Sequence, residues 1–117
     1  MRLFSFTKKE RILKRAEFNN LTLYGKRHHT KHFTIIIKPN RGDSTRLGII
    51  VSKRMGKSVT RNRIKRLIRE FFRLHKHVIP KGYDVLIVAT KENDTLNFAT
   101  IQEEVGNLLV KNGNLFS

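Results

Sequence analysis

One segment of ten residues determines how the rest of the chain is interpreted, and it reads Arg61-Asn62-Arg63-Ile64-Lys65-Arg66-Leu67-Ile68-Arg69-Glu70. At about 100° per residue, residues 59–78 separate into two faces. The apolar face carries Ile64, Leu67, Ile68, Phe71, His75 and Val78, with Phe72 and Leu74 at its borders. The opposite face carries Asn62, Lys65, Arg66, Arg69, Arg73 and Lys76, with Arg61 on its edge and Arg63 on the far flank. The pattern predicts a long amphipathic helix, capped by Ser58 or Thr60 and continuing to about His77.

The polar face of this predicted helix is almost entirely cationic. Residues 52–76 contain ten Lys or Arg side chains and a single acid, Glu70. A solvated helix face usually mixes acids with bases, because opposite charges one turn apart stabilise the helix. Here the like charges destabilise it, so we expect a polyanion to bind this face. Arginine is the commonest cation of the helix, and its planar guanidinium group suits phosphate oxygens.

Strands are predicted on both sides of the helix. Residues 32–38 are rich in β-branched side chains and are followed by a turn at residues 39–44. Residues 45–52 form a second apolar run, and residues 83–89 form a third. The second and third runs flank the long helix and therefore predict a β-α-β unit.

Two further helices complete the predicted order α-β-β-α-β-α. The first begins near residue 8 or near Lys14, two alternatives that the sequence leaves open, and ends at Gly25. The last runs from Phe98 to about Gly113. This order predicts a small α+β sandwich that forms one domain over residues 1–117.

The composition narrows the class of partner. The chain carries 25 Lys and Arg against 9 Asp and Glu, a formal net charge of +16, concentrated in residues 1–32 and 52–76. This balance favours nucleic acid over an anionic membrane, since a membrane-surface helix would need the apolar face that the core requires. No apolar run approaches the roughly 20 residues of a membrane span. The absence of cysteine excludes thiolate zinc sites and fits a cytoplasmic protein.

The central segment closely resembles the signature helix of the bacterial ribonuclease P protein family. Residues 47–60 resemble the strand and turn that precede it in that family, and Glu17-Phe18 with Tyr24-Gly25 resemble the family's first helix. The resemblance implies a mixed sheet of about four strands with three helices and a left-handed β-α-β crossover, a ribosomal-protein-S5-domain-2-like arrangement. The fourth strand has two candidate origins, a split of residues 45–53 or residues near the N-terminus.

The same resemblance implies one set of RNA contacts on the long helix. In this sequence the family's RNA-binding positions are Arg61, Asn62, Arg63, Lys65, Arg66 and Arg69, with Lys53, Arg54 and Lys57 at the helix entrance. Arg73 lies on the same predicted cationic face and joins this set. The partner implied for these residues is ribonuclease P RNA, together with the start of the precursor-tRNA leader.

A second implied site is a cleft between the first helix and the sheet that binds the single-stranded 5′ leader of precursor tRNA. Its candidate residues are Lys14, Arg15, Phe18, Thr22, Phe33 and Ile36. A base could stack on the ring of Phe18. Helical spacing alone favours a core position for Phe18, and the resemblance makes the cleft position an equal alternative. Thr22 and Ile36 stand where many members of the family have an aromatic residue, so Phe33 or Tyr24 are candidate substitutes.

The sequence predicts no catalytic or metal-binding residues. The nine acids are scattered, whereas a two-metal nuclease needs clustered carboxylates. His28, His29 and His32 lie close in sequence but have no neighbouring acid or cysteine, so we expect a solvated loop. In the resembled enzyme the RNA subunit holds Mg²⁺ and catalyses hydrolysis, and the protein is a non-catalytic subunit for tRNA 5′ maturation. A structural ribosomal-type RNA-binding protein is the main alternative, and a DNA-binding protein is the third.

Overall fold

A computed structural model describes residues 11–12, 15–89 and 97–111 of the chain. The elements are α1 (Arg15–Tyr24), β1 (Lys26–His29), β2 (Phe33–Pro39), β3 (Arg46–Val51), a 3₁₀ turn η2 (Lys53–Met55), α2 (Ser58–His75), β4 (Tyr83–Ala89), α3 (Phe98–Gly106) and a π-helical turn η3 (Asn107–Lys111).

The four strands form one mixed sheet in the order β1-β2-β4-β3. β2 pairs antiparallel with β1 and β4, whereas β3 and β4 are parallel. The predicted four-stranded α+β architecture is therefore confirmed. The fourth strand, however, is Lys26–His29, which comes neither from residues 45–53 nor from the start of the chain. Its sequence carries no apolar alternation, because an edge strand can be held by backbone pairing to a single neighbour.

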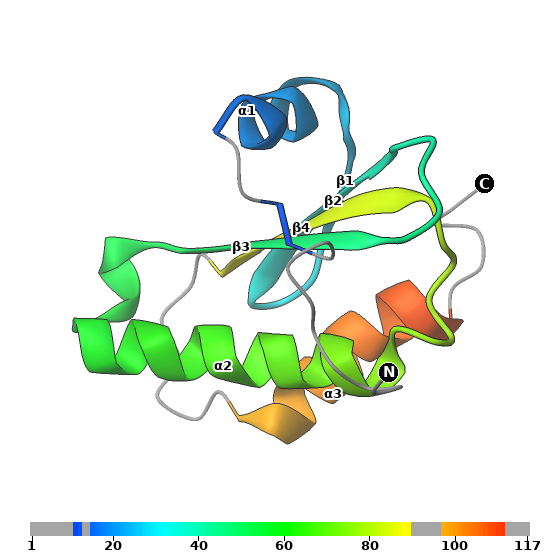
Figure 1. Ribbon diagram of the computed structural model, residues 1–117. Helices are drawn as coiled ribbons and strands as arrows, with labels where there is room; N and C mark the ends of the chain where they lie inside the picture. Colours follow the sequence, from blue (N-terminus) through cyan, green and yellow to red (C-terminus); the bar gives the residue numbers. More distant parts are fainter. Residues whose placement is uncertain (1–10, 13–14, 90–96, 112–117) are drawn as a thin grey trace.

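The β3-α2-β4 unit has the handedness that the family resemblance implies. In Figure 1, β3 and β4 run in the same direction above α2, which returns beneath them, and β4 lies behind β3. The chain therefore turns counter-clockwise as it moves away from the viewer, and the crossover is left-handed. General rules for parallel strands predict the right-handed form, so local sequence patterns could not have indicated this topology.

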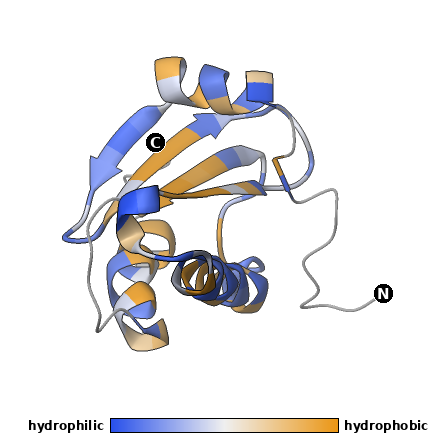
Figure 2. Cartoon of the chain, turned by 90° about the vertical axis from the view of Figure 1, so that its left-hand side faces the viewer, coloured by the Kyte–Doolittle hydropathy of each residue, from blue (hydrophilic) through white to orange (hydrophobic). Residues whose placement is uncertain are grey.

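The helices cover both faces of the sheet, with α1 on one face and α2 with α3 on the other (Figure 1). The larger core lies between the sheet and α2 and α3, where Ile64, Ile68, Phe71 and Phe72 of α2 are buried. A smaller core of Ile12, Leu21, Ile36 and Leu86 lies under α1. Figure 2 shows that the apolar strands lie between these helical layers and that the hydrophilic β1 forms the outer edge.

The ends of the helices refine the sequence predictions. Residues 11–12 pair with β3, through Ile12 N–H and the Leu47 carbonyl at 3.0 Å, so the first helix does not run through from residue 8. α2 ends at His75, about two residues before the predicted end, and Val78 beyond it is 48% exposed rather than in the core. α3 ends at Gly106 and η3 continues to Lys111, and the predicted end at Gly113 lies outside the described residues.

Candidate nucleic-acid interface

The cationic face of α2 points away from the protein. Burial of Ile64, Ile68, Phe71 and Phe72 fixes the rotation of the helix, because these side chains occupy the larger core. The opposite side then presents the predicted RNA-binding set: Asn62, Arg63, Arg66 and Arg69 are exposed, and Arg61, Lys65 and Arg73 are half-buried. The predicted division of the helix into an apolar and a cationic face is confirmed.

Arg73 has an acidic partner on the same helix. Its guanidinium group forms an ion pair with Glu70 one turn earlier. This hydrogen bonding raises the pKa of Arg73 and lowers the pKa of Glu70. The charge of Arg73 is thus partly neutralised within the protein, which makes Arg73 a weaker candidate for an RNA contact.

The N-terminus of α2 carries cations and lacks a side-chain cap. Lys57 occupies the N-cap position without a capping hydrogen bond, and the first turn contains no acid. The predicted caps Ser58 and Thr60 are wrong: both lie inside the helix, and the Ser58 hydroxyl accepts a hydrogen bond from Arg61 Nη2 at 3.2 Å. Free backbone N–H groups and the helix dipole attract anions at this end.

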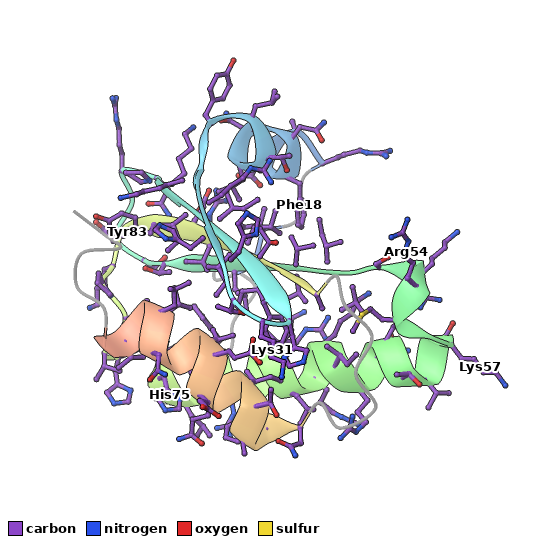
Figure 3. The ribbon with its side chains drawn as sticks, turned by 180° about the vertical axis from the view of Figure 1, so that it is seen from behind. Phe18, Lys31, Arg54, Lys57, His75 and Tyr83 are labelled. Atoms are coloured by element: carbon purple, nitrogen blue, oxygen red, sulfur yellow. The ribbon has the colours of Figure 1, made fainter. Side chains whose placement is uncertain are left out.

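The turn that leads into α2 projects two more cations beside this helix end. Ser52 Oγ accepts a hydrogen bond from the Arg54 N–H at 3.2 Å, which orders η2. Gly56 has a φ of 117°, a conformation that few other residues adopt, and it turns the chain into the helix. Lys53 and Arg54 are exposed, and Figure 3 shows Arg54 and Lys57 extending outward at the start of α2. A concentrated positive potential results at this corner of the molecule.

The ring of Phe18 lies between α1 and the sheet (Figure 3). A Cβ atom at Gly48 of β3 would lie only 2.8 Å from Phe18 Cε1, so the glycine allows the ring to rest directly on the strand. Phe18 is half-buried and lines two hollows. It is therefore both a packing residue and a wall of the cleft, which reconciles the two interpretations of its position in the sequence.

The two hollows beside Phe18 connect the cleft to α2. The larger, about 450 Å³, is lined by Arg15, Phe18, Asn19, Thr22, Ile49 and Ile50. The smaller, about 190 Å³, is lined by Arg11, Ile12, Phe18, Leu47, Gly48, Ile49, Lys65 and Arg69. Lys65 and Arg69 belong to the cationic face of α2, so this face and the cleft form one continuous surface. The sequence alone treats them as two separate sites.

Three of the six predicted cleft residues line the larger hollow. Arg15, Phe18 and Thr22 line it, and Lys14 lies outside the described residues. Ile36 is on the correct face of the sheet but is fully buried beneath α1. The prediction that Phe33 lines the cleft is wrong. Phe33 belongs to the larger core on the opposite face of the sheet, because residues three apart on a strand, such as Phe33 and Ile36, point to opposite sides.

Tyr24, the other aromatic candidate, lies outside the cleft. Its ring is 74% exposed, and the ammonium group of Lys38 lies 6.0 Å from the ring centroid. Sequence reasoning missed Asn19 of α1, and it missed Ile49 and Ile50, which contribute the apolar wall of the larger hollow from the edge strand β3. No local pattern distinguishes the two isoleucines from ordinary strand residues.

A partly buried ion network links α1 to the sheet. Arg46 of β3 donates two hydrogen bonds to Asp84 of β4, Nε to Oδ1 at 2.9 Å and Nη2 to Oδ2 at 2.7 Å. Its Nη1 also lies 2.7 Å from Glu17 Oε2 of α1. Hydrogen bonding to Asp84, followed by that to Glu17, raises the pKa of Arg46 despite partial burial. This network holds the helix that carries Phe18 at a set distance from β3.

His32 has an acidic neighbour that the sequence does not suggest. Its Nδ1 lies 2.5 Å from Glu104 Oε2 of α3, and the Glu104 Oε1 accepts from the His32 N–H at 2.9 Å. The predicted solvated loop is therefore wrong for His32, which is 8% exposed. Burial lowers the pKa of His28, with smaller contributions from Lys26 and His29. Among the described residues no group of three His, Asp or Glu side chains is arranged to hold a metal ion.

Within the described ranges, no helix is long and apolar enough to cross a membrane.

Comparisons with known proteins agree on one family. The family model described as ribonuclease P matches residues 6–113. The ribonuclease P protein component of Syntrophus aciditrophicus is 44% identical over 111 residues, which is 95% of this chain and 93% of that protein. The corresponding protein of Thermotoga maritima is 38% identical over 109 residues, 90% of this chain and 93% of that protein.

Solved structures show the same similarity in three dimensions. The RNase P protein from Thermotoga maritima superimposes with a TM-score of 0.80 at 36% identity, covering 88% of this chain and 97% of that one. The RNase P protein of Staphylococcus aureus also gives a TM-score of 0.80, at 33% identity, covering 92% of this chain and 98% of that one.

Proposed function

Because the chain belongs to the ribonuclease P protein family, we propose that it binds the catalytic RNA and the 5′ leader of precursor tRNA at the same time. The cationic face of α2 and the corner formed by Lys53, Arg54 and Lys57 bind the RNA subunit. The cleft under α1 binds the leader. The protein thereby promotes endonucleolytic removal of the leader, and the RNA performs the hydrolysis.

This proposal rests mainly on one observation: the cationic face of α2 and the cleft under α1 adjoin each other. Lys65 and Arg69 lie on the cationic face of α2 and also line the hollow beside Phe18. A strand of RNA that leaves the catalytic RNA near α2 can therefore reach the smaller hollow beside Lys65 and Arg69, and it enters the larger hollow past Phe18 and Ile49, which line both. Phosphates would lie near Lys65, Arg69 and Arg15, where each contact releases counterions and strengthens binding at low salt.

Phe18 supplies the contact that a single-stranded leader needs. Stacking of one base on an aromatic side chain contributes about 1–3 kcal/mol and tolerates different bases, since every base has a π-face. Leaders differ in sequence among precursor tRNAs, so a stacking site suits them better than a site built on base-edge hydrogen bonds. The apolar side chains of Ile49 and Ile50 beside the ring fit the same role.

The polypeptide is proposed to be a non-catalytic subunit, and the magnesium ions of the reaction are proposed to be held by the RNA. Four of the described carboxylates are engaged with cationic or histidine partners: Glu17 and Asp84 with Arg46, Glu70 with Arg73, and Glu104 with His32. They lie on different elements and hold the fold together, which leaves them poorly suited to bind a pair of catalytic metal ions.

Cleavage of precursor tRNA by a bacterial ribonuclease P RNA at low magnesium tests the proposal. Wild-type protein should restore cleavage, and the protein alone should not cut. The triple variant Arg61→Ala, Arg63→Ala, Arg66→Ala should fail to restore it, because it loses contacts to the RNA subunit. A matched triple variant, Lys31→Ala, Arg41→Ala, Lys81→Ala, removes the same charge from exposed positions elsewhere and should retain activity.

A second experiment, a binding measurement, tests the contact between the cleft and the leader. Phe18→Ala in the assembled enzyme should weaken binding of precursor tRNA by about tenfold, the lower part of the range for one stacked base, and leave binding of mature tRNA unchanged. Absence of rescue by the wild-type protein with its matched RNA would refute the proposal and favour a structural ribosomal-type role.

A further inference from the structure

A row of four side chains crosses the whole sheet on the α1 face. Ile50 of β3 pairs with Val88 of β4, Val88 pairs with Thr34 of β2, and Thr34 pairs with His29 of β1. Paired residues on adjacent strands point to the same side of a sheet. That side is the one covered by α1, because Val88 packs against the small core beneath this helix.

The helix covers only part of this row. Ile50 is 40% exposed, Thr34 and Val88 are half-buried, and His29 is exposed. Ile50 lines the larger hollow together with Phe18 and Thr22, so the row begins in the proposed leader cleft. It ends three strand spacings away at the edge strand β1, a span of about 14 Å, or roughly the rise of four stacked nucleotides.

Two interactions order the β1 end of the row. His29 Nδ1 lies 3.0 Å from Thr34 Oγ1, which positions the imidazole ring against the neighbouring strand. Arg27, two residues earlier and on the same face, donates from Nη2 to the Thr22 carbonyl at 2.6 Å. Thr22 is in the last turns of α1, so Arg27 joins the end of that helix to β1. An aromatic ring and a guanidinium group thus lie on the same face of the edge strand β1.

We propose that the β1 end of this row is a second nucleotide-binding subsite, at which His29 stacks on a leader nucleotide farther from the cleavage site than the one at Phe18. The inference rests on the proposed function of the cleft. The RNA subunit is placed beside α2, so the leader enters at the β3 side, next to Lys65 and Arg69, and leaves over β1. Arg27 is positioned near the phosphate of the same nucleotide.

The chemistry of β1 favours RNA over a second copy of this chain. An exposed edge strand can pair with another strand, but β1 reads Lys26-Arg27-His28-His29 and follows directly on the cationic first part of the chain. Lys and Arg on an edge strand oppose such pairing, because two copies would bring like charges together. The same charges attract a polyanion.

A leader-length series tests the subsite. The affinity of the assembled enzyme is measured for precursor tRNAs whose leaders are shortened one nucleotide at a time. His29→Ala should leave the affinity for short leaders unchanged. It should lower the affinity for long leaders by about fivefold or more, the lower limit for loss of one stacked base. His29→Phe should retain the affinity for long leaders, whereas His29→Asn, which lacks the aromatic ring, should not.

Lys31→Ala is the matched control, since Lys31 is exposed in the loop immediately after β1 and carries a full charge. Its effect, if any, should be equal at all leader lengths. A His29→Ala variant that matches wild type at every length, or that loses equal affinity for mature tRNA, overturns the subsite. If Phe18→Ala shows its leader-dependent loss and His29→Ala does not, only the subsite fails; if wild type itself shows no leader dependence, the proposed function of the cleft fails.

Discussion

Glu104 illustrates how a single residue organises distant parts of this chain. Its carboxylate accepts hydrogen bonds from the His32 N–H, from Thr30 Oγ1 at 2.7 Å and from the His32 ring, and so attaches the β1–β2 loop to α3. Burial raises the pKa of Glu104, but hydrogen bonds from His32 and Thr30 outweigh burial and hold the pKa below its ordinary value. A depressed carboxyl pKa stabilises the fold above the ordinary range of glutamate and loses this contribution as the pH falls through the folded value.

Glu104→Gln should lower the free energy of unfolding by about 2 kcal/mol at neutral pH, the typical cost of losing hydrogen bonds to a buried charged group. The difference from wild type should shrink as the pH falls below about 4, because acid then protonates the wild-type carboxylate as well. Urea denaturation at several pH values measures this. Glu103→Gln is the control, since Glu103 is adjacent but exposed, and should change stability by less than about 0.5 kcal/mol. A difference that does not vary with pH would contradict the assignment.

At the scale of the element, the residues at the N-terminus of α2 destabilise the helix. A typical helix starts with an acid or a capping hydroxyl that satisfies its first N–H groups, whereas this one starts with Lys57 and no side-chain cap. The dipole of the helix adds positive potential at the same place. Its apolar face compensates by burying two phenylalanines and two isoleucines. The N-terminus of α2 is thus suited to an anionic ligand, and the cost is a lower stability of the free protein.

Replacing Lys57 by aspartate should therefore separate stability from binding. Lys57→Asp should stabilise the free protein by about 1 kcal/mol, because aspartate caps the helix and complements its dipole. The same variant should bind ribonuclease P RNA more weakly, and the deficit should shrink as salt is raised. Thermal melts and filter binding measure the two effects.

Lys57→Ser is the control for this pair of effects. It adds a cap without adding a negative charge, so it should gain most of the stability and lose less of the affinity. A Lys57→Asp variant that binds RNA as tightly as wild type would show that the N-terminus of α2 does not face the RNA.

At the scale of the whole molecule, the chain carries a net charge of +16, and most of its described Lys and Arg side chains are exposed. Its described acids are largely used inside the molecule, where Arg46 links Glu17 to Asp84 and His32 pairs with Glu104. The remaining cations on α2 and η2 repel one another. Self-repulsion of this kind destabilises a compact state and is relieved by bound counterions.

The free protein should accordingly be destabilised at low salt and stabilised by polyvalent anions. Sulfate or phosphate should raise the melting temperature more than chloride does at equal ionic strength, since an anion that binds only the folded state shifts the equilibrium toward it. Sulfate also strengthens apolar burial in any protein, so the Arg61→Ala, Arg63→Ala, Arg66→Ala variant is the control. Equal shifts in the variant and wild type would argue against an anion site on α2.

Much of the fold could be predicted from local patterns. The rotation of α2 followed from the spacing of Ile64, Ile68 and Phe71, because a helix repeats every 3.6 residues whatever it packs against. β4 was predicted with its exact bounds, Tyr83–Ala89, because a buried central strand is apolar throughout. β1 could not be predicted in this way, since an edge strand of cations owes its existence to the backbone of β2.

The candidate site was predicted in part, for equally physical reasons. The family resemblance implied Arg15, Phe18 and Thr22 as cleft residues, and all three line one hollow, since helical spacing puts them on one side of α1. That they bind a leader stays a prediction. Phe33 was misplaced, although strand alternation by itself separates it from Ile36. Which of the two faces α1 depends on where the helix docks, and that position is set by Arg46 through Glu17 and Asp84.

The sequence by itself determined the amphipathic α2, the three apolar strands and the concentration of positive charge, because periodicity and charge are properties of neighbouring residues. Only the tertiary structure decided the left-handed crossover, the pairing of β1, the contact of Glu104 with His32, and the joining of the cleft to the cationic face through Lys65 and Arg69. Each of these depends on residues far apart in the chain, whose contacts gain free energy only once the cores on the two faces of the sheet have packed.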